Sequence, residues 1–266
     1  METANHQQGR PSWAELMTTD PTAATSFYGG LFGWTDDARP IPESDESYHM
    51  QMLQGVPVSA IAKLRPEQAS MGMPPAWGVY LAVDDVDATV AKVEGAGGKV
   101  MLPPMDVMEQ GRMAVLVDPT GAVVSLWQAR AHQGFGRMNE HGAVTWMELV
   151  TDDVPKATAF YRALLGVETQ TMPMPEAGFD YTVMGPTGNE GTGVMPKMPQ
   201  MGEMPNVWAV YFEVDDADAA AARARALGGE VVQEPMDTPP AGRIAMIRDP
   251  QGAVFGVIKS MAPPAG

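Results

Sequence analysis

Two glutamates lie where acid–base chemistry is possible, and each follows a tryptophan by two residues. They are Glu15 after Trp13, and Glu148 after Trp146. The surrounding residues alternate as in a β-strand, where side chains two apart share a face, so each glutamate should share a face with its tryptophan. A carboxyl group there can act as a general base if burial raises its pKa and if it reaches a substrate proton.

The same glutamates could instead be structural. Arg112 and Arg243 are duplicated as well, each after a glycine. Glu15 with Arg112, or Glu148 with Arg243, could therefore form fixed ion pairs. A catalytic group need not survive in both copies of a repeat, whereas a structural group must serve both, so we favour the ion pairs.

A tyrosine and a histidine are further candidates for catalysis. Tyr80 and its counterpart Tyr211 could donate a hydrogen bond to a ligand, or could simply pack in the core. His49 lies in a predicted strand where the other repeat has Thr182. This asymmetry would let one half keep a chemistry that the other lost, although a lone strand histidine is commonly structural. We take Glu15, His49 and Tyr80 as the candidate catalytic residues.

Indole rings are unusually frequent in the predicted strands. They could stack on a flat aromatic ligand, each contributing about 1 kcal/mol beyond its buried area, or they could pack between sheet and helices. Many of the 22 methionines lie in loops and late strands, where flexible thioethers could form an adaptable apolar wall or merely fill gaps. The predicted ligand-binding residues are Trp13, Trp77, Ser125, Trp127, Trp146, Glu148, Trp208 and Tyr211.

These candidates recur because the chain is a tandem duplication. The segment that starts at Trp13 returns at Trp146, an offset of 133 residues, and the segment that starts at Trp77 returns at Trp208, an offset of 131. A period of half the chain suits two copies of one domain. We expect a first domain over residues 9–129, a linker over 130–142 and a second domain over 143–262.

Each repeat predicts two βαβββ units, hence an α+β fold with four such units. In the first unit, Asp20 and Pro21 begin a helix that Gly33 ends. In the second, a helix begins at Asp84-Asp85 and stops at Gly97-Gly98. The final two strands form a hairpin whose turn, residues 118–121, has proline second and glycine fourth, as in a type I turn.

Composition limits the classes of partner. With 17 Lys and Arg against 33 Asp and Glu, the net charge of −16 argues against nucleic acid and anionic membranes. The chain has no cysteine, so it has neither a disulfide framework nor a thiolate nucleophile. Its first twenty residues lack the apolar core of a signal peptide, and we expect a cytoplasmic protein. We expect either a monomer with a pseudo-twofold arrangement or a homodimer.

The ordered motifs resemble a known superfamily. They are W-x-E-L-x-T-x-D, F-Y-x-x-L-x-G, V-D-D-x-D-A, G-G-x-V and D-P-x-G-A-V, with most of them recurring in the second copy. Together they resemble the vicinal oxygen chelate superfamily, which includes glyoxalase I, bleomycin-resistance proteins and extradiol dioxygenases. The doubled form is similar to two-domain glyoxalase-like proteins of actinobacteria, among them a culture-filtrate antigen and proteins labelled hydroxylases. The resemblance implies curved mixed sheets around a cleft in each half.

The family's metal positions carry unsuitable residues here. Metal-dependent members place His, Gln or Glu at four strand positions of the cleft, because a divalent ion needs converging nitrogen or oxygen ligands. Indole has only a donor N–H, and glycine or alanine offers no ligand. We therefore expect no metal site. The corresponding positions are Trp13, Gly78, Ser125 and one of residues 59–62, and in the second copy Trp146, Ala209, Gly256 and one of residues 194–195.

Three functions stay open at this point. The first is binding of a small apolar or aromatic molecule in a cleft without metal. The second is an enzyme, a hydroxylase or a glyoxalase-like lyase, although the sequence has no recognisable flavin, haem or iron site and we expect no cofactor. The third is a scaffold or interaction protein whose clefts are closed by side chains.

Overall fold

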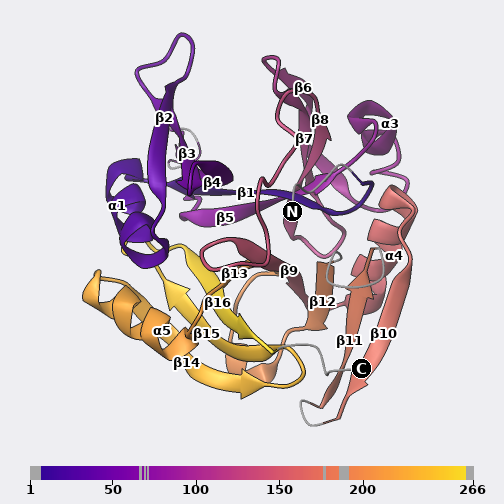
Figure 1. Cartoon of the computed structure of the whole chain (residues 1–266). Coiled ribbons are helices and arrows are strands. Elements are labelled where there is room, and N and C mark those ends of the chain that lie inside the picture. Colours follow the sequence, from indigo (N-terminus) through magenta and orange to yellow (C-terminus); the bar gives the residue numbers. More distant parts are fainter. Residues whose placement is uncertain are drawn as a thin grey trace.

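Two eight-stranded mixed sheets form the protein, one from each half of the chain (Figure 1). The computed structural model describes residues 7–65, 68, 70, 72–175, 178–185 and 192–261. The first half contains β1 (Pro11–Thr18), α1 (Pro21–Phe32), β2 (Thr35–Pro40), β3 (Ser47–Leu53), β4 (Val56–Lys63), β5 (Ala76–Ala82), α3 (Val86–Val90), β6 (Lys99–Val107), β7 (Gly111–Val117) and β8 (Val123–Ala129). The second contains β9 (Val144–Thr151), α4 (Val154–Leu165), β10 (Thr169–Met174), β11 (Phe179–Met184), β12 (Thr192–Pro196), η1 (Pro199–Met201), β13 (Val207–Glu213), α5 (Ala217–Ala226), β14 (Glu230–Thr238), β15 (Gly242–Arg248) and β16 (Val254–Ser260).

The two sheets have the same topology. Their strand orders are β2-β3-β4-β1-β5-β8-β7-β6 and β10-β11-β12-β9-β13-β16-β15-β14. In each, the first strands of the two βαβββ units run antiparallel at the centre, β1 beside β5 and β9 beside β13. Outside them, β4 runs parallel to β1 and β8 parallel to β5, with β12 and β16 in the same places of the second sheet. The predicted four βαβββ units are confirmed.

Local sequence signals set the ends of the long helices. Asp20 accepts a hydrogen bond from the backbone N–H of Ala23 at 3.0 Å, which satisfies an N–H that the first turn leaves free. Gly33 ends the helix at φ 75, a left-handed conformation that glycine adopts without steric cost. Asp153 and Gly166 do the same for α4. No helix in the described part of the chain is long and apolar enough to cross a membrane.

The two halves are joined by a reciprocal pair of buried hydrogen bonds. Tyr28 of α1 donates to Asp249 Oδ2 of the second half at 3.0 Å. Tyr161 of α4 donates to Asp118 Oδ2 of the first half, also at 3.0 Å. Each aspartate also accepts backbone N–H groups of its own D-P-x-G turn through Oδ1. The duplicated turn therefore shapes a hairpin and anchors the partner domain, a contact that obeys the reciprocity of a two-fold interface.

Two of the predicted ligand-binding tryptophans belong to this junction, so their placement in a cleft was wrong. Trp77 donates its indole N–H to the Tyr28 hydroxyl at 3.0 Å, and Trp208 donates to Tyr161 at 2.9 Å. Successive side chains of a strand point to opposite faces, and Trp77 is an odd number of residues from Tyr80. It therefore faces helix α1 while Tyr80 faces the other way.

The second glycine of each Gly-Gly pair makes room for a ring of the other half. A Cβ on Gly98 would lie 2.6 Å from the Phe160 ring, and one on Gly229 would lie 3.0 Å from the Phe27 ring. The first glycines, Gly97 and Gly228, have φ values of 88 and 90 at the predicted helix stops. In the second half the pair follows α5 after one residue, whereas in the first half the predicted helix stop was wrong, because α3 ends at Val90 and turns fill residues 91–97. Each pair admits an aromatic side chain across the domain junction.

Candidate functional site

The predicted glutamates lie on the sheet face that points away from α1 and α4. We call this the inner face. In the first half, ladder pairing places Glu15 opposite Ala60 of β4 and Gly78 of β5, and Trp13 opposite Tyr80. In the second half, Glu148 pairs with Gly193 and Ala209. Paired residues of neighbouring strands share a face, so the family's metal positions converge on these glutamates.

In the second half, Glu148 accepts two phenolic hydrogen bonds. Tyr181 donates to Oε2 at 2.6 Å, and Tyr211 donates to Oε1 at 3.0 Å. Trp146 donates its indole N–H to the Tyr181 hydroxyl at 2.8 Å. The glutamate is only 7% exposed. Four side chains from three strands, β9, β11 and β13, thus form one hydrogen-bonded chain, which we call the Trp–Tyr–Glu–Tyr cluster.

The first half contains the same cluster. Trp13 donates to the Tyr48 hydroxyl at 3.2 Å, and Tyr80 donates to Glu15 Oε1 at 3.3 Å. Tyr48 also hydrogen-bonds to Glu15. Trp13 and Glu15 therefore share a face, as the alternation predicts, and Tyr80 lies on the same face. Tyr48 is a member that the sequence reasoning missed.

The missed tyrosines carry the same duplication signal as the rest. Tyr48 and Tyr181 are 133 residues apart, the offset that also relates Glu15 to Glu148. Searching that offset for every tyrosine would have found them. Their approach to the glutamate depends on the pairing of β3 with β4 and of β11 with β12, which no local motif reveals.

Small residues at the family's metal positions admit these tyrosines. A Cβ on Gly193 would lie 1.8 Å from the Tyr181 hydroxyl and 2.8 Å from the Trp146 indole nitrogen. A Cβ on Gly256 would lie 2.2 Å from the Tyr211 ring. Phenol groups therefore occupy the space in which a metal-ligating side chain would stand. The position opposite Glu148 is Gly193, one residue before the 194–195 segment that the sequence indicated.

Burial sets the protonation of the cluster. Removal from water raises the pKa of Glu15 and of Glu148 above the usual value, although the tyrosine hydrogen bonds oppose the shift. Burial and the neighbouring glutamate raise the pKa of Tyr181 and Tyr211 well above their usual value. The phenols therefore stay protonated donors at neutral pH, and the carboxyl is a hydrogen-bond acceptor that can also take up a proton.

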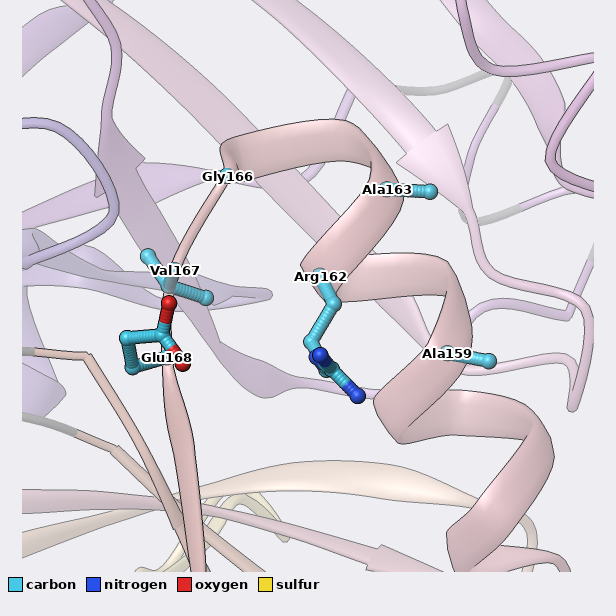
Figure 2. Close-up of a pocket in the computed structure, with 6 residues that line it drawn as sticks. All are labelled: Ala159, Arg162, Ala163, Gly166, Val167 and Glu168. Atoms are coloured by element: carbon cyan, nitrogen blue, oxygen red, sulfur yellow. The ribbon is translucent and has the colours of Figure 1, made fainter.

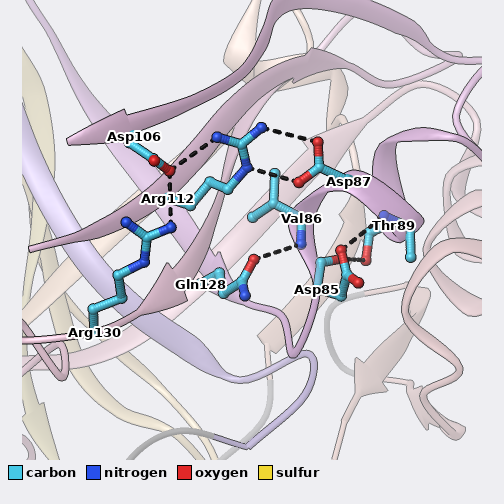
Figure 3. Close-up of polar contacts among 9 residues, drawn as sticks. Asp85, Val86, Asp87, Thr89, Asp106, Arg112, Gln128 and Arg130 are labelled. Atoms are coloured by element: carbon cyan, nitrogen blue, oxygen red, sulfur yellow. Dashed lines mark hydrogen bonds and ion pairs between the residues drawn. The ribbon is translucent and has the colours of Figure 1, made fainter. Parts of the chain in front are cut away.

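The prediction that the two glutamates form ion pairs with Arg112 and Arg243 was wrong. Arg112 donates to Asp87 at 2.7 Å and to Asp106 at 2.9 Å, on the surface beside α3 (Figure 3). Arg243 pairs with Asp218 and Asp237 in the second half. Their pKa values are raised by these carboxylates, as hydrogen bonding to the charged form requires. The arginines hold the α3 and α5 ends to the last hairpins and leave the glutamates to the tyrosines.

His49 is not brought to the cluster. It pairs with Ile61 on the face opposite Tyr48, and its Nδ1 lies 2.8 Å from Asp36 Oδ2. The same aspartate accepts from the Gln51 amide at 2.9 Å. Thr182, its counterpart, hydrogen-bonds to Thr171. The catalytic role suggested for His49 has no support from its position.

Ser125 and Trp127 do join the inner face of the first half. Ser125 pairs with Tyr80 in the ladder and hydrogen-bonds to its hydroxyl. Trp127 packs edge-on against the Tyr80 ring, with centroids 6.4 Å apart, and donates its indole N–H to the His132 carbonyl at 3.0 Å. His132 belongs to the predicted linker, which therefore packs against the domain.

The donor set of the inner face does not fit a divalent metal. Within the described residues no group of three or more His, Asp or Glu side chains is placed to hold an ion. The converging positions supply one carboxylate per half, and phenols already donate to both its oxygens in the second half. The neutral phenols donate to that carboxylate, and the indole N–H donates to a phenol, so these groups leave too few ligands for a closed or open metal site.

A separate hollow lies on the outer side of the second half. It runs between the C-terminal end of α4 and the start of β10 (Figure 2). Arg162 and Glu168 are its charged residues, and the others are small or apolar. It contains none of the predicted site residues, so the cluster and not this hollow is the candidate site.

The protein has two sheets of paired βαβββ units, and each sheet has a Trp–Tyr–Glu–Tyr cluster on its central strands. This arrangement is that of a glyoxalase-like protein. The chain belongs to the glyoxalase/bleomycin resistance protein/dioxygenase superfamily, whose model matches residues 10–126 and 143–257. The resemblance suggested by the motifs is therefore confirmed, once for each half.

Two named relatives cover almost the whole chain. "Putative glyoxylase CFP32" of Mycobacterium tuberculosis (strain CDC 1551 / Oshkosh) is 48% identical over 256 residues, which are 96% of this chain and 97% of the relative. "Anthracycline biosynthesis protein DauV" of Streptomyces sp. (strain C5) is 38% identical over 261 residues, 94% of this chain and 93% of the relative. Both alignments therefore span both halves of this chain.

Solved structures agree in fold at low identity. The 2,3-dioxygenase LapB from Pseudomonas sp. KL28 has a TM-score of 0.66 at 13% identity, covering 98% of this chain and 95% of that one. An Mn(II)-bound glyoxalase from Novosphingobium aromaticivorans also has a TM-score of 0.66, at 16% identity, covering 96% and 83%. This likeness establishes the fold and leaves the activity to the residues of the site.

Proposed function

We propose that the protein binds a small apolar or aromatic molecule on the inner face of its sheets, without a metal ion. The molecule stacks on the indole of the Trp–Tyr–Glu–Tyr cluster and hydrogen-bonds to its glutamate and tyrosines. Flat aromatic molecules gain about 0.5–1.5 kcal/mol from such stacking beyond their buried area. A carboxyl and phenols fix the orientation of the ligand, as the few polar groups of an apolar site commonly do.

The observation that carries this proposal is the duplicated cluster at the family's ligand positions. Tyr181 and Tyr211 occupy the space that side chains at Gly193 and Gly256 would take. Where metal-dependent members have metal-ligating side chains, this protein therefore has a hydrogen-bonded cluster. Methionines share the face in the second half: ladder pairing places Met172 beside Tyr181 and Met246 beside Gly256. Their thioethers supply a polarisable apolar surface next to the indole.

The first experiment is a binding titration of protein stripped with EDTA. Metal content is measured by mass spectrometry, and tryptophan fluorescence is followed against a panel of indole, quinoline and naphthalene derivatives. The proposal expects saturable changes in the metal-free protein. A full equivalent of metal retained on the inner face, or a folded protein that responds to no member of the panel, would overturn it.

A proton-transfer enzyme is the second candidate, favoured by the raised pKa of Glu148. A carboxyl with a raised pKa can exchange a proton nearer to neutral pH than an ordinary glutamate can. The relative named as a glyoxylase supports this candidate. The test is Glu148→Gln, with Glu15→Gln as the matched change in the first half: a catalysed reaction on the bound molecule should lose turnover while the variant keeps its fold and its ligand. Retained turnover in both variants would contradict it.

A further inference from the structure

We infer that the two inner faces have diverged: the second half takes the ligand, the first half is occupied by the chain's own linker, and the ligand is an uncharged aromatic molecule with a hydroxyl donor. This inference rests on the proposed function and assigns its site and its ligand class.

The linker crosses the end of the first sheet and is held there by backbone hydrogen bonds. The N–H of Phe135 donates to the Ser12 carbonyl at 3.0 Å, and the N–H of Gly136 donates to the Pro57 carbonyl at 2.9 Å. Gly134 has φ 101, and a Cβ there would lie 2.6 Å from the Ser12 carbonyl oxygen. The segment thus has a fixed path close to β1, which its glycines permit.

Two linker rings cover the Trp13 indole. Phe135 lies across it at a centroid distance of 5.4 Å and an angle of 35°, and His132 stands edge-on at 4.4 Å. Trp13 and Phe135 are each only 3% exposed. Burial lowers the pKa of His132 to about 4, so its imidazole is an uncharged aromatic ring at neutral pH. The indole of the first half therefore already holds aromatic groups supplied by the chain.

The corresponding indole in the second half is half-buried. In the described part of the chain, Trp146 makes no ring contact with another aromatic side chain. At the offset of 131, His132 corresponds to Pro263 and Phe135 to Gly266, neither of them aromatic, and both lie outside the described residues. Phe135 therefore shows which kind of group this position accepts in the first half, and we infer that a separate aromatic molecule takes the equivalent position beside Trp146.

The tyrosines indicate the polar part of that molecule. Tyr80 accepts a hydrogen bond from Ser125, and the residue equivalent to Ser125 in the second half is Gly256. In the described part of the chain, the Tyr211 hydroxyl donates to Glu148 and accepts from no side chain. A carboxylate has about four acceptor positions, of which Glu148 uses two for tyrosines. The vacant positions are acceptors, which suits a ligand that donates an O–H.

The experiment compares 2-naphthol with its methyl ether, which has the same rings and cannot donate. Calorimetric titration of the EDTA-treated full chain should give one equivalent of 2-naphthol, bound about 3–10 times more tightly than the ether, as one neutral hydrogen bond provides. Tyr211→Phe should alter this preference or the affinity by a similar factor, whereas Tyr80→Phe in the first half should change neither. Phe135→Ala should raise the stoichiometry to two.

The outcomes separate this inference from the proposed function. If the unchanged protein binds two equivalents of 2-naphthol with equal affinity, or if Tyr80→Phe changes the binding and Tyr211→Phe does not, the assignment to the second half is overturned. The proposed function, binding of an aromatic molecule, would still hold. Equal affinity for naphthol and ether would overturn the hydroxyl donor. A folded Phe135→Ala variant that still binds one equivalent would overturn the role of the linker. Failure of both compounds to bind would count against the proposed function as well.

Discussion

Replacing Gly193 by alanine should disrupt the cluster of the second half. The new Cβ would lie 1.8 Å from the Tyr181 hydroxyl, far inside van der Waals contact, so the phenol must move away from β12. The movement breaks the 2.6 Å hydrogen bond to Glu148 and the 2.8 Å hydrogen bond from Trp146. The clashing atom is the end of a side chain, so the chain can still fold around the change.

The size of the effect follows from the bonds lost. Two buried hydrogen bonds contribute about 1–3 kcal/mol to the free energy of unfolding, and removing a strand glycine returns about 0.5–1 kcal/mol. We expect a net loss of about 1–2 kcal/mol, or a melting temperature about 2–8 °C lower for a chain of this size. The freed Tyr181 should then ionise closer to its usual pKa of 10.0.

Gly78→Ala is the matched control. Gly78 is also an inner-face strand glycine beside a cluster glutamate, but its Cβ would meet only the Glu15 carbonyl at an ordinary 3.6 Å. The second half already has Ala209 at the equivalent position. This variant should be unchanged or slightly more stable. The free energy of unfolding in urea and the phenolate absorbance are measured on both variants. A Gly193→Ala protein that is as stable as Gly78→Ala, and in which Tyr181 titrates no nearer to its usual pKa, would refute the steric argument.

Three further predictions concern the same groups. Tyr28→Phe and Tyr161→Phe should each lower the free energy of unfolding by about 2–4 kcal/mol in urea titrations, because each leaves a buried aspartate oxygen and an indole N–H unpaired; a loss below about 0.5 kcal/mol would contradict the domain junction. All six tyrosines have a raised pKa, so phenolate absorbance should stay low up to alkaline unfolding, and a tyrosine that titrates reversibly near 10.0 in the folded protein would oppose this. Because burial raises the pKa of Glu15 and Glu148 above 4.5, the folded state holds these protons more tightly, and stability falls as the pH rises from about 4.5 through the folded pKa values. The free energy of unfolding of the natural protein should therefore fall over that pH window relative to that of a Glu15→Gln, Glu148→Gln double variant. If the difference between the two proteins does not vary with pH, burial leaves the pKa of the two carboxyls unshifted.

The sequence predicted the fold well because the signals were local and doubled. Helix caps such as Asp20 and Gly33 act within a few residues, and the alternation around Trp13 fixes the face of Glu15. The same alternation could have excluded Trp77 from the inner face, since it lies three residues from Tyr80 in one strand. Trp77 therefore packs against α1, although its indole is also a side chain suited to a ligand site.

The rest of the site depended on pairings that sequence spacing does not determine. Arg112 had several acidic residues within reach, and the choice of Asp87 and Asp106 over Glu15 depends on how α3 and β6 pack beside β7. The linker has glycines, two histidines and a phenylalanine, a composition typical of an exposed connection. Its contact with Trp13 follows from backbone hydrogen bonds to Ser12 and Pro57, which are distant in sequence.

Fluorine NMR of the protein labelled with fluorotryptophan tests the central claim most directly. Each of the six tryptophans gives its own signal, assigned by single Trp→Phe variants. With EDTA in excess and 2-naphthol added stepwise, the account predicts a saturable shift of the Trp146 signal at one equivalent, while Trp77 and Trp208 at the domain junction and the covered Trp13 stay in place. A Trp146 signal that never moves, or that moves only after a divalent metal is added, would contradict it.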